Sequence, residues 1–283
     1  MNPTLPPFSP GAFLTPAVDW LNTHWHPLFA LISDVIQFVL DNATALLLAP
    51  PPWGLMLVVV GLAFVGLGRR PAMVALLALG FCWGVGLWDE AMQTITLVSV
   101  AVALSVAIAF PLGVLAARRP RLEAAIRPVL DIMQTVPPWV YLIPAVILFS
   151  LGNVPAIIAT IVYGIPPMLR LTTLAFQQIP KDLLELGQAL GAPPRTVLFK
   201  IEVPAAMPTL LVGLNQCILL SLAMVVLAGL VGSGGLGAEV TRGLTRMEMG
   251  LGLRAGLAIV AVALLLDRLS RAALGGQGGR VRR

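Results

Sequence analysis

The feature that most constrains this chain is a series of long apolar runs that are almost free of charge. Roughly 20 apolar residues in a helix cross a bilayer core about 30 Å thick. The predicted spans are 53–68, 72–88, 91–117, 129–151, 154–176, 206–231 and 251–270. Because lipid cannot satisfy backbone polar groups, such runs must fold as helices. We therefore expect an all-α, polytopic transmembrane helix bundle of about seven spans.

Composition supports a membrane protein and argues against a nucleic-acid partner. Hydrophobic residues make up 58% of the chain and charged residues 11%, against about 25% charged in soluble domains. The net charge is +5, but the basic residues lie in small groups at the ends of the apolar runs. That distribution is typical of membrane orientation.

The basic residues also predict the direction of the chain. With the N-terminus outside, the cytoplasmic connections hold 14 of the 18 Lys and Arg residues. These are Arg69, Arg70, Arg118, Arg119, Arg121, Arg127, Lys181, Arg195, Lys200, Arg268, Arg271, Arg280, Arg282 and Arg283. Because cytoplasmic loops carry an excess of Lys and Arg, we expect the N-terminus outside and the C-terminus in the cytoplasm.

The segments outside the spans divide the chain further. Residues 1–23, rich in Pro and polar side chains, predict a loose N-terminal tail. Residues 24–52 predict an amphipathic helix and a Pro-rich linker, with the helix either in the membrane interface or braced against the bundle. The transmembrane domain then covers 53–274, and 275–283 form a basic cytoplasmic tail. His24 and His26 would lie on nearly opposite faces of a helix, so no metal site is expected.

A charged segment, residues 177–208, separates two of the apolar runs and is too polar to cross a bilayer. Pro180 can open a first short helix, and Gly191 is a suitable stop for it. Pro193 and Pro194 would start a second short helix that runs to Lys200. Helices this short are not stable alone, so the corner that they form needs a surface to pack against.

The spacing within this segment resembles the cytoplasmic loop of permease subunits of ATP-binding-cassette (ABC) importers. That loop follows the pattern Glu-Ala-Ala, three residues, Gly, nine residues, Ile-x-Leu-Pro. Here it corresponds to Glu185-Leu186-Gly187, Gly191 and Ile201-x-Val203-Pro204, with three departures from the consensus. The resemblance implies a coupling helix, in a loop spanning 177–204, that docks into a cleft of the ATPase; the alternative is an ordinary interhelical loop. The implied coupling residues are Asp182, Glu185, Leu186, Gly187, Leu190, Gly191, Ala192, Pro194, Arg195, Phe199 and Pro204.

The fourth predicted span contains adjacent prolines, Pro137 and Pro138, which remove backbone donors and predict a kinked or broken helix. Broken helices at membrane depth usually border a cavity. The candidate translocation path is Gln134, Thr135, Pro137, Trp139, Tyr141, Asn215, Gln216, Ser221 and Met224. The alternative for the polar members is that they only join helices by hydrogen bonds. Aromatic faces suit a quaternary ammonium ion, but Trp and Tyr are also common interface anchors.

Further segments are similar to permeases of quaternary-amine importers, whose cargoes are choline, glycine betaine and proline betaine. They are Asp131-x-x-Gln134-Thr135-x-Pro137, Val140-Tyr141-Leu142-x-Pro144, Met224-Val225-Val226, Gly234-Gly235-Leu236-Gly237 and Leu266-Asp267-Arg268-Leu269. The likeness extends over about residues 17–271. It implies a homodimer in the bacterial plasma (inner) membrane, bound to ATPase subunits and served by an extracytoplasmic substrate-binding protein.

The chain lacks the Gly-x-x-x-x-Gly-Lys-Ser/Thr loop that cradles phosphates, so it is not expected to be an enzyme by itself. We expect no cofactor in this chain, with ATP and Mg bound by the partner ATPase. Other readings stay open: an ABC permease for another small cargo such as an amino acid, a secondary transporter driven by an ion gradient, or a membrane scaffold that transports nothing.

Overall fold

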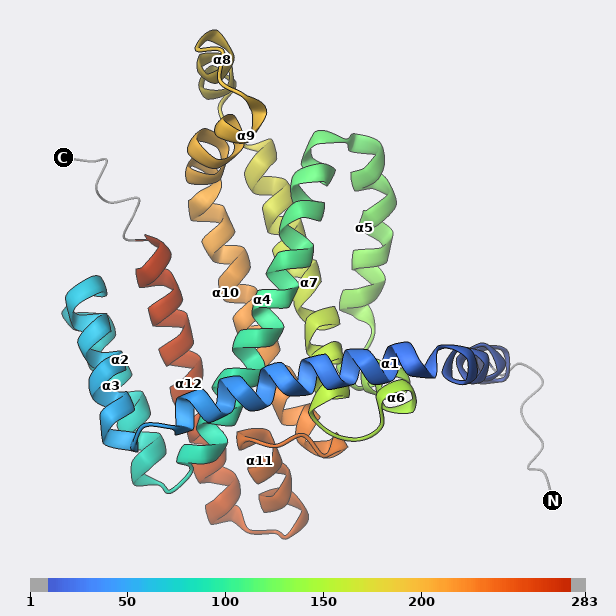
Figure 1. Cartoon of the computed structure of the whole chain (residues 1–283), viewed down its shortest axis with the longest axis vertical. Coiled ribbons are helices and arrows are strands. Elements are labelled where there is room, and N and C mark those ends of the chain that lie inside the picture. The colour runs from blue at the N-terminus through green and yellow to red at the C-terminus, as the bar shows by residue number, and fades with distance from the viewer. Residues whose placement is uncertain (1–9, 276–283) are drawn as a thin grey trace.

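The structure is a computed structural model that describes residues 10–275, which form helices joined by short connections (Figure 1). The first helices are α1 (Pro10–Leu48), α2 (Pro52–Leu67), α3 (Arg69–Gly84), α4 (Trp88–Arg118), α5 (Pro120–Thr135), α6 (Pro138–Phe149) and α7 (Asn153–Gln177). They are followed by α8 (Lys181–Ala189), α9 (Pro194–Val197), the π-helical turn η1 (Leu198–Glu202), α10 (Val203–Ala228), the 3₁₀ turn η2 (Gly229–Val231), α11 (Leu236–Thr245) and α12 (Met249–Gly275). The expected all-α helix bundle is confirmed.

Three long helices, α4, α7 and α10, form the centre of the bundle, and α12 packs against α10 and α3. Their contacts rely on small residues, because a Cβ built on Gly113 of α4 would lie 2.6 Å from the Cβ of Thr172 in α7. Small residues let helix backbones approach closely in membrane bundles. Helices α8 and α9 and the turn η1 form a hairpin, residues 181–202, called here the α8 hairpin. It projects from one end of the bundle, the α8 end, and α11 lies at the other, the α11 end (Figure 1).

Four of the predicted spans correspond to helices that are long and apolar enough to cross a membrane. These helices are Trp88–Arg118, Asn153–Gln177, Pro194–Val231 and Met249–Ala272. Within the described residues, five helices meet that standard, or up to six if one bent pair counts as a single span. The fifth helix is Asp19–Leu48 of α1, which was not predicted to span.

The run 129–151 is not one straight span but two helices, α5 and α6, bent by 96° at their junction. The predicted break is therefore confirmed, and it falls at Val136 and Pro137, between the two helices. Tyr141 donates a hydrogen bond of 2.9 Å from its hydroxyl to the carbonyl of Met133 across the break. This bond satisfies a backbone acceptor near the point where the prolines interrupt the ladder.

The first two predicted spans are shorter than a straight crossing requires. Helices α2 and α3 have 16 residues each, or about 24 Å, against a bilayer core of about 30 Å. They form a hairpin that turns at Gly68, whose φ is 97°, and that packs on α12.

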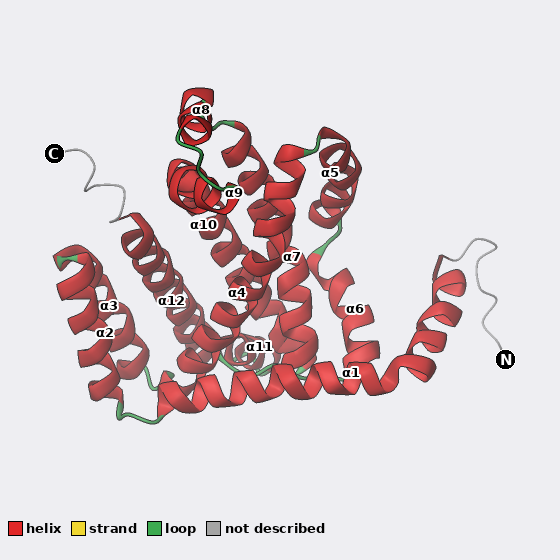
Figure 2. Ribbon diagram, turned by 45° about the horizontal axis from the view of Figure 1, so that its top comes forward, coloured by secondary structure: helices red, strands yellow, loops and turns green. Residues whose placement is uncertain are grey.

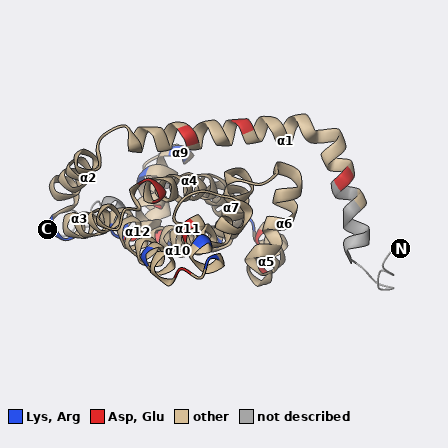
Figure 3. Ribbon diagram, turned by 90° about the horizontal axis from the view of Figure 1, so that it is seen from below, with Lys and Arg blue, Asp and Glu red and all other residues tan. Residues whose placement is uncertain are grey.

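Helix α1 corrects the prediction of a loose tail over residues 1–23, because the helix begins at Pro10; residues 1–9 lie outside the described part. It runs across the bundle rather than along it and contacts α4, α6 and α7 (Figures 1 and 2). Seen from the α11 end, it passes along one side of the molecule and carries well-separated acidic residues (Figure 3). Trp25, Leu31 and Phe38 stay 49%, 59% and 69% exposed. The helix is thus braced against the bundle while leaving an apolar surface uncovered.

The Gly-rich connection 232–250 contains a helix of its own, α11, packed beneath α10 and α12. A Cβ built on Gly237 would lie 2.0 Å from the carbonyl oxygen of Val225, so the two backbones nearly touch. Thr94 accepts a hydrogen bond of 2.9 Å from the backbone N–H of Leu236 and so ties α11 to α4. The basic tail predicted for 275–283 falls, apart from Gly275, outside the described residues.

Candidate functional site

The predicted coupling loop forms the α8 hairpin, which stands clear of the bundle (Figure 1). Its first helix is α8, with Asp182 in the first turn, where a carboxylate complements the helix dipole. The helix ends at Ala189 and is followed closely by Gly191, whose φ of 62° is left-handed. Ala192 donates a backbone hydrogen bond of 3.1 Å to the carbonyl of Gly187, as in a glycine-terminated helix. The predicted stop at Gly191 is confirmed.

The second half of the hairpin differs from the prediction of a separate short helix ending near Lys200. Pro194 begins α9 as expected, but the chain continues through the π turn η1 directly into α10. Proline at 204 has no N–H to donate to the preceding turn, and a π turn is a common way to accommodate such a local mismatch. This half of the hairpin is therefore a continuous helical extension of α10.

The two halves of the hairpin pack through Gly187. A Cβ built on this residue would lie 3.0 Å from Cδ1 of Ile201 and 3.2 Å from Cγ2 of Val197. Gly187 stands where the importer pattern has alanine, so the departure from the pattern falls at the tightest point of the corner. It lets α8 lie close against η1.

The outer surface of the hairpin carries an apolar tip, defined here as Leu186, Leu190 and Phe199. Their exposed fractions are 54%, 73% and 63%. Apart from the two glycines, the remaining predicted coupling residues are Ala192, which is half-buried, and five that are exposed: Asp182, Glu185, Pro194, Arg195 and Pro204. Large apolar side chains left uncovered beside polar ones are typical of a protein contact surface.

An ion pair that the sequence did not predict joins the hairpin to the bundle. Glu202, the last residue of η1, is only 9% exposed. Its Oε2 accepts a hydrogen bond of 2.5 Å from Nη2 of Arg118 at the end of α4. The sequence held one signal of this ion pair: Glu202 is an acidic residue next to an apolar helix, and a buried carboxylate there requires a partner.

The candidate path residues divide into four groups, of which Asn215 forms the last. Tyr141 and Met224 come together in a small cluster with Leu142 and Ala159, and Tyr163, which sequence reasoning missed, packs against it. Gln134, Thr135, Pro137 and Trp139 are exposed around the break, and so is Gln216 on α10. Ser221 is buried, and its hydroxyl has no partner among the described residues.

Asn215 belongs to a different contact, between α10 and α12. With its amide oriented to suit its neighbours, it donates to Asp267 and accepts a hydrogen bond of 2.7 Å from Arg271. Asp267 also accepts a bond of 2.7 Å from Nε of Arg271. This is the interhelical hydrogen bonding that was the alternative to a role in the path.

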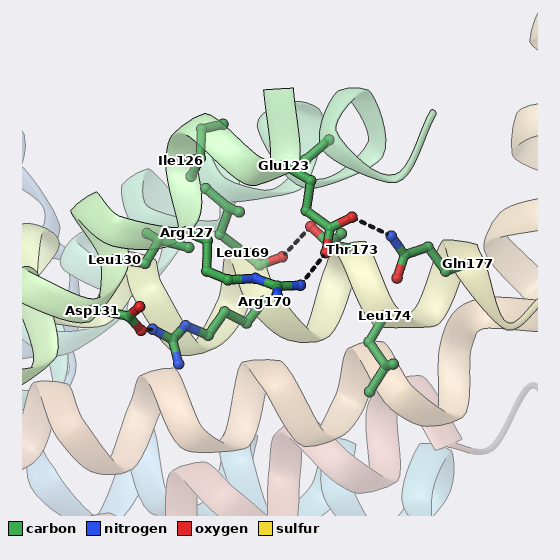
Figure 4. A pocket seen from close by; sticks show the side chains of 11 residues that line it. Glu123, Ile126, Arg127, Leu130, Asp131, Leu169, Arg170, Thr173, Leu174 and Gln177 are labelled. Carbon is green, nitrogen blue, oxygen red and sulfur yellow. Dashed lines mark hydrogen bonds and ion pairs between the residues drawn. The ribbon is translucent and has the colours of Figure 1, made fainter. Parts of the chain in front are cut away.

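A cavity of about 410 Å³ lies between α5 and α7, with Ala116 of α4 also on its wall (Figure 4). Arg170 of α7 pairs there with Asp131 of α5. Glu123 accepts hydrogen bonds of 2.7 Å from both Arg127 and Gln177. The remaining walls are apolar: Ala116, Ile126, Leu130, Leu169 and Leu174, with the methyl-bearing Thr173.

The sequence of this chain is similar to those of known transport proteins. Residues 109–274 match the family described as binding-protein-dependent transport system inner membrane component. The chain is 42% identical to the glycine betaine/proline betaine transport system permease protein ProW of Escherichia coli (strain K12), over 92% of this chain and 74% of that protein. It is 36% identical to the glycine betaine transport system permease protein OpuAB of Bacillus subtilis (strain 168), over 90% of each.

Solved structures agree on the fold. The chain is similar to an inward-facing form of the MetNI methionine ABC transporter, with a TM-score of 0.57 and 23% identity, over 70% of this chain and 96% of that one. This chain therefore belongs to the family of multi-pass inner-membrane permease components of binding-protein-dependent ABC transport systems, in which ATP hydrolysis resides on a separate chain.

Proposed function

We propose that this permease carries a small quaternary ammonium compound, such as glycine betaine, proline betaine or choline, into the cytoplasm. The support is the naming of its relatives, which include glycine betaine, proline betaine and choline permeases. The two permeases that the chain matches by sequence at 36–42% identity give no such support to an amino-acid cargo or an ion-gradient-driven transporter. The methionine transporter, at 23% identity, is similar in fold alone.

The working unit in this proposal contains two copies of the chain, ATPase subunits that bind ATP and Mg, and a separate receptor for cargo. The observation that carries it is the apolar tip, because its exposed leucines and phenylalanine are an uncovered apolar surface of the kind that a partner subunit covers. The connections rich in Lys and Arg, before α3 and between α4 and α5, lie at this same α8 end (Figure 1). That distribution favours a cytoplasmic α8 end, with the N-terminus outside.

The hairpin is suited to act as a lever. Because η1 continues into α10 and Glu202 pairs with Arg118, a displacement of the tip is passed to both α10 and α4. ATP-driven closure of the ATPase pair would favour whichever bundle conformation fits the new position of the two hairpins. In this proposal the broken pair α5 and α6 moves with them around a central path that includes Gln134, Thr135, Pro137, Trp139, Tyr141, Gln216, Ser221 and Met224.

The test is reconstitution of the chain with its ATPase and its binding protein in proteoliposomes. Uptake of labelled glycine betaine, proline betaine and choline is measured with ATP inside and outside, and again after an ionophore collapses ion gradients. The proposal expects uptake that requires ATP on the α8 side and survives the ionophore. Uptake that follows the ion gradient, or none with any of the three compounds, would contradict it.

A further inference from the structure

The cavity between α5 and α7 has the size and the walls of a small-molecule site. Its volume of about 410 Å³ falls within the range of ligand pockets, about 300–1,000 Å³. Apolar side chains make up much of its lining, and the charged groups converge on it from two helices (Figure 4). None of its residues is among the implied coupling residues or the candidate path residues.

The position of the cavity links the broken span to the α8 hairpin. Gln177, on its wall, ends α7, and α8 begins four residues later at Lys181. On α5 the lining residues Arg127 and Asp131 share a helical face with Gln134, since residues three, four and seven apart lie on one side of a helix. Gln134 precedes the break by only a few residues, so this face leads from the break to the α8 end.

The charges in the cavity are of two kinds. Arg127 and Glu123 are neighbours on one helix, four residues apart, and the carboxylate is also held by Gln177. Arg170 and Asp131 instead come from different helices and meet across the cavity. Their side chains remain 40% and 59% exposed, so the pair is open to exchange with a charged ligand.

Arg170 also has donors to spare. A guanidinium has five N–H donors in a fork that matches a carboxylate. Within the described part of the chain, the Nη2 of Arg170 donates to Asp131. Its Nε has no partner but is buried, so the Nη groups of the 40% exposed side chain are the donors that a ligand can reach. Arg170 can therefore bind a second carboxylate without first losing the whole of its present contact.

We propose that Asp131 and Arg170 form a subsite for a zwitterion that carries both a carboxylate and a quaternary ammonium group, through which cargo passes on its way out of the bundle. The carboxylate of the ligand binds the guanidinium of Arg170. The quaternary ammonium, which has no hydrogen to donate, lies against the carboxylate of Asp131 by charge attraction. One internal ion pair is replaced by two contacts to the ligand, so neither protein charge is left unpaired.

This inference rests on the proposed function and narrows it, because it favours betaines over choline, which lacks a carboxylate. It also predicts weak binding. Both side chains are well solvated, and attraction between charges is reduced in such surroundings. A low affinity suits a site that must release its ligand.

The first experiment measures site occupancy without transport. Leu174, on the cavity wall and 42% exposed, is replaced by Cys in the assembled, ATP-free transporter, and labelling by a trimethylammonium thiosulfonate reagent is followed. The native Cys82 and Cys217 are 0% exposed and give little background. Because the expected binding is weak, glycine betaine is added at about 50 mM. We expect it to slow labelling at least threefold, and choline at the same concentration to slow labelling less than half as much. No protection by glycine betaine, or equal protection by choline, would overturn the proposal.

The second experiment separates binding from structural support. Arg170→Gln is expected to abolish the protection and to lower glycine betaine uptake at least tenfold, and Asp131→Asn to act in the same direction. The double variant D131N/R170Q has no unpaired charge, so a purely structural ion pair predicts recovery of uptake, whereas a subsite predicts none. Recovery in the double variant would overturn the proposal.

Arg127→Gln is the comparison within the same cavity, because it also removes a guanidinium. Arg127→Gln is expected to reduce glycine betaine uptake by less than a third of the loss seen with Arg170→Gln. Equal losses of uptake in the two variants would overturn the assignment to Arg170. The proposed function is judged separately by uptake in the unaltered transporter. If that transporter imports glycine betaine but shows no protection at L174C, the subsite fails and the proposed function stands.

Discussion

Arg118 at the end of α4 and Glu202 at the end of η1 form an ion pair of 2.5 Å at the base of the hairpin. The side chain of Glu202 is 11% exposed and that of Arg118 is 50% exposed. The carboxylate therefore depends on this guanidinium, while the guanidinium retains some contact with solvent.

Replacement of Arg118 by Ala is expected to destabilise the protein. Leaving a largely buried carboxylate without its partner costs about 1–3 kcal/mol, measurable as a lower free energy of unfolding in detergent titrated with dodecyl sulfate. The matched control is Arg127→Ala, which breaks an i,i+4 pair whose Arg is 69% exposed and should cost about 0.3–0.5 kcal/mol. Equal effects in the two variants would show that the pair at the base of the hairpin has no special role.

Local backbone chemistry made several features predictable from sequence. Gly191 ends α8 because a left-handed residue is needed there, and Pro137 with Pro138 breaks the fourth apolar run. Each of these signals depends only on the residue and its immediate neighbours. The spacing of the coupling loop was readable for the same reason.

Features that depend on the mutual placement of helices were not predictable. Arg118 and Glu202 are 84 residues apart, and Arg170 and Asp131 are 39 apart. Nothing in a single sequence shows which faces of these helices meet. The start of α1 was missed for another reason: prolines suggested a tail, whereas Pro16 and Pro27 lie within the helix.

The conformation of Gly191 predicts a selective effect on coupling. With its φ of 62° and no atom within 4 Å of a built Cβ, the residue is constrained by backbone geometry and not by space. Gly191→Val should strain this turn by roughly 1–2 kcal/mol and lower cargo-stimulated ATPase activity of the assembled complex by about 5–30-fold. Gly191→Asn, which tolerates the left-handed region, should stay close to the unaltered protein. If Asn and Val were equally harmful, the constraint would be steric and the explanation wrong.

The apolar tip predicts where the ATPase binds. Leu190 is 73% exposed, and burying a leucine in an interface contributes about 1.5–3 kcal/mol. Leu190→Ser should weaken binding of the ATPase by about 10–100-fold, measured by titration of the ATPase onto the permease in nanodiscs. Leu244→Ser, at a residue of α11 that is 75% exposed, removes the same side chain from the other end and should leave that affinity unchanged. An unchanged affinity in Leu190→Ser would place the docking surface elsewhere.

The contact between α10 and α11 predicts a strong effect from the smallest possible substitution. A Cβ at Gly237 would lie 2.0 Å from the backbone oxygen of Val225. The backbone of one helix fixes the Cβ and the backbone of the other fixes the oxygen, so one helix must move. Gly237→Ala should therefore cost about 1–3 kcal/mol, seen as a lower melting temperature of the purified permease. Gly256 of α12 meets nothing within 4 Å, so Gly256→Ala should be neutral or stabilise by up to about 1 kcal/mol. If both variants melted at the same temperature, the close approach of α10 and α11 would be refuted.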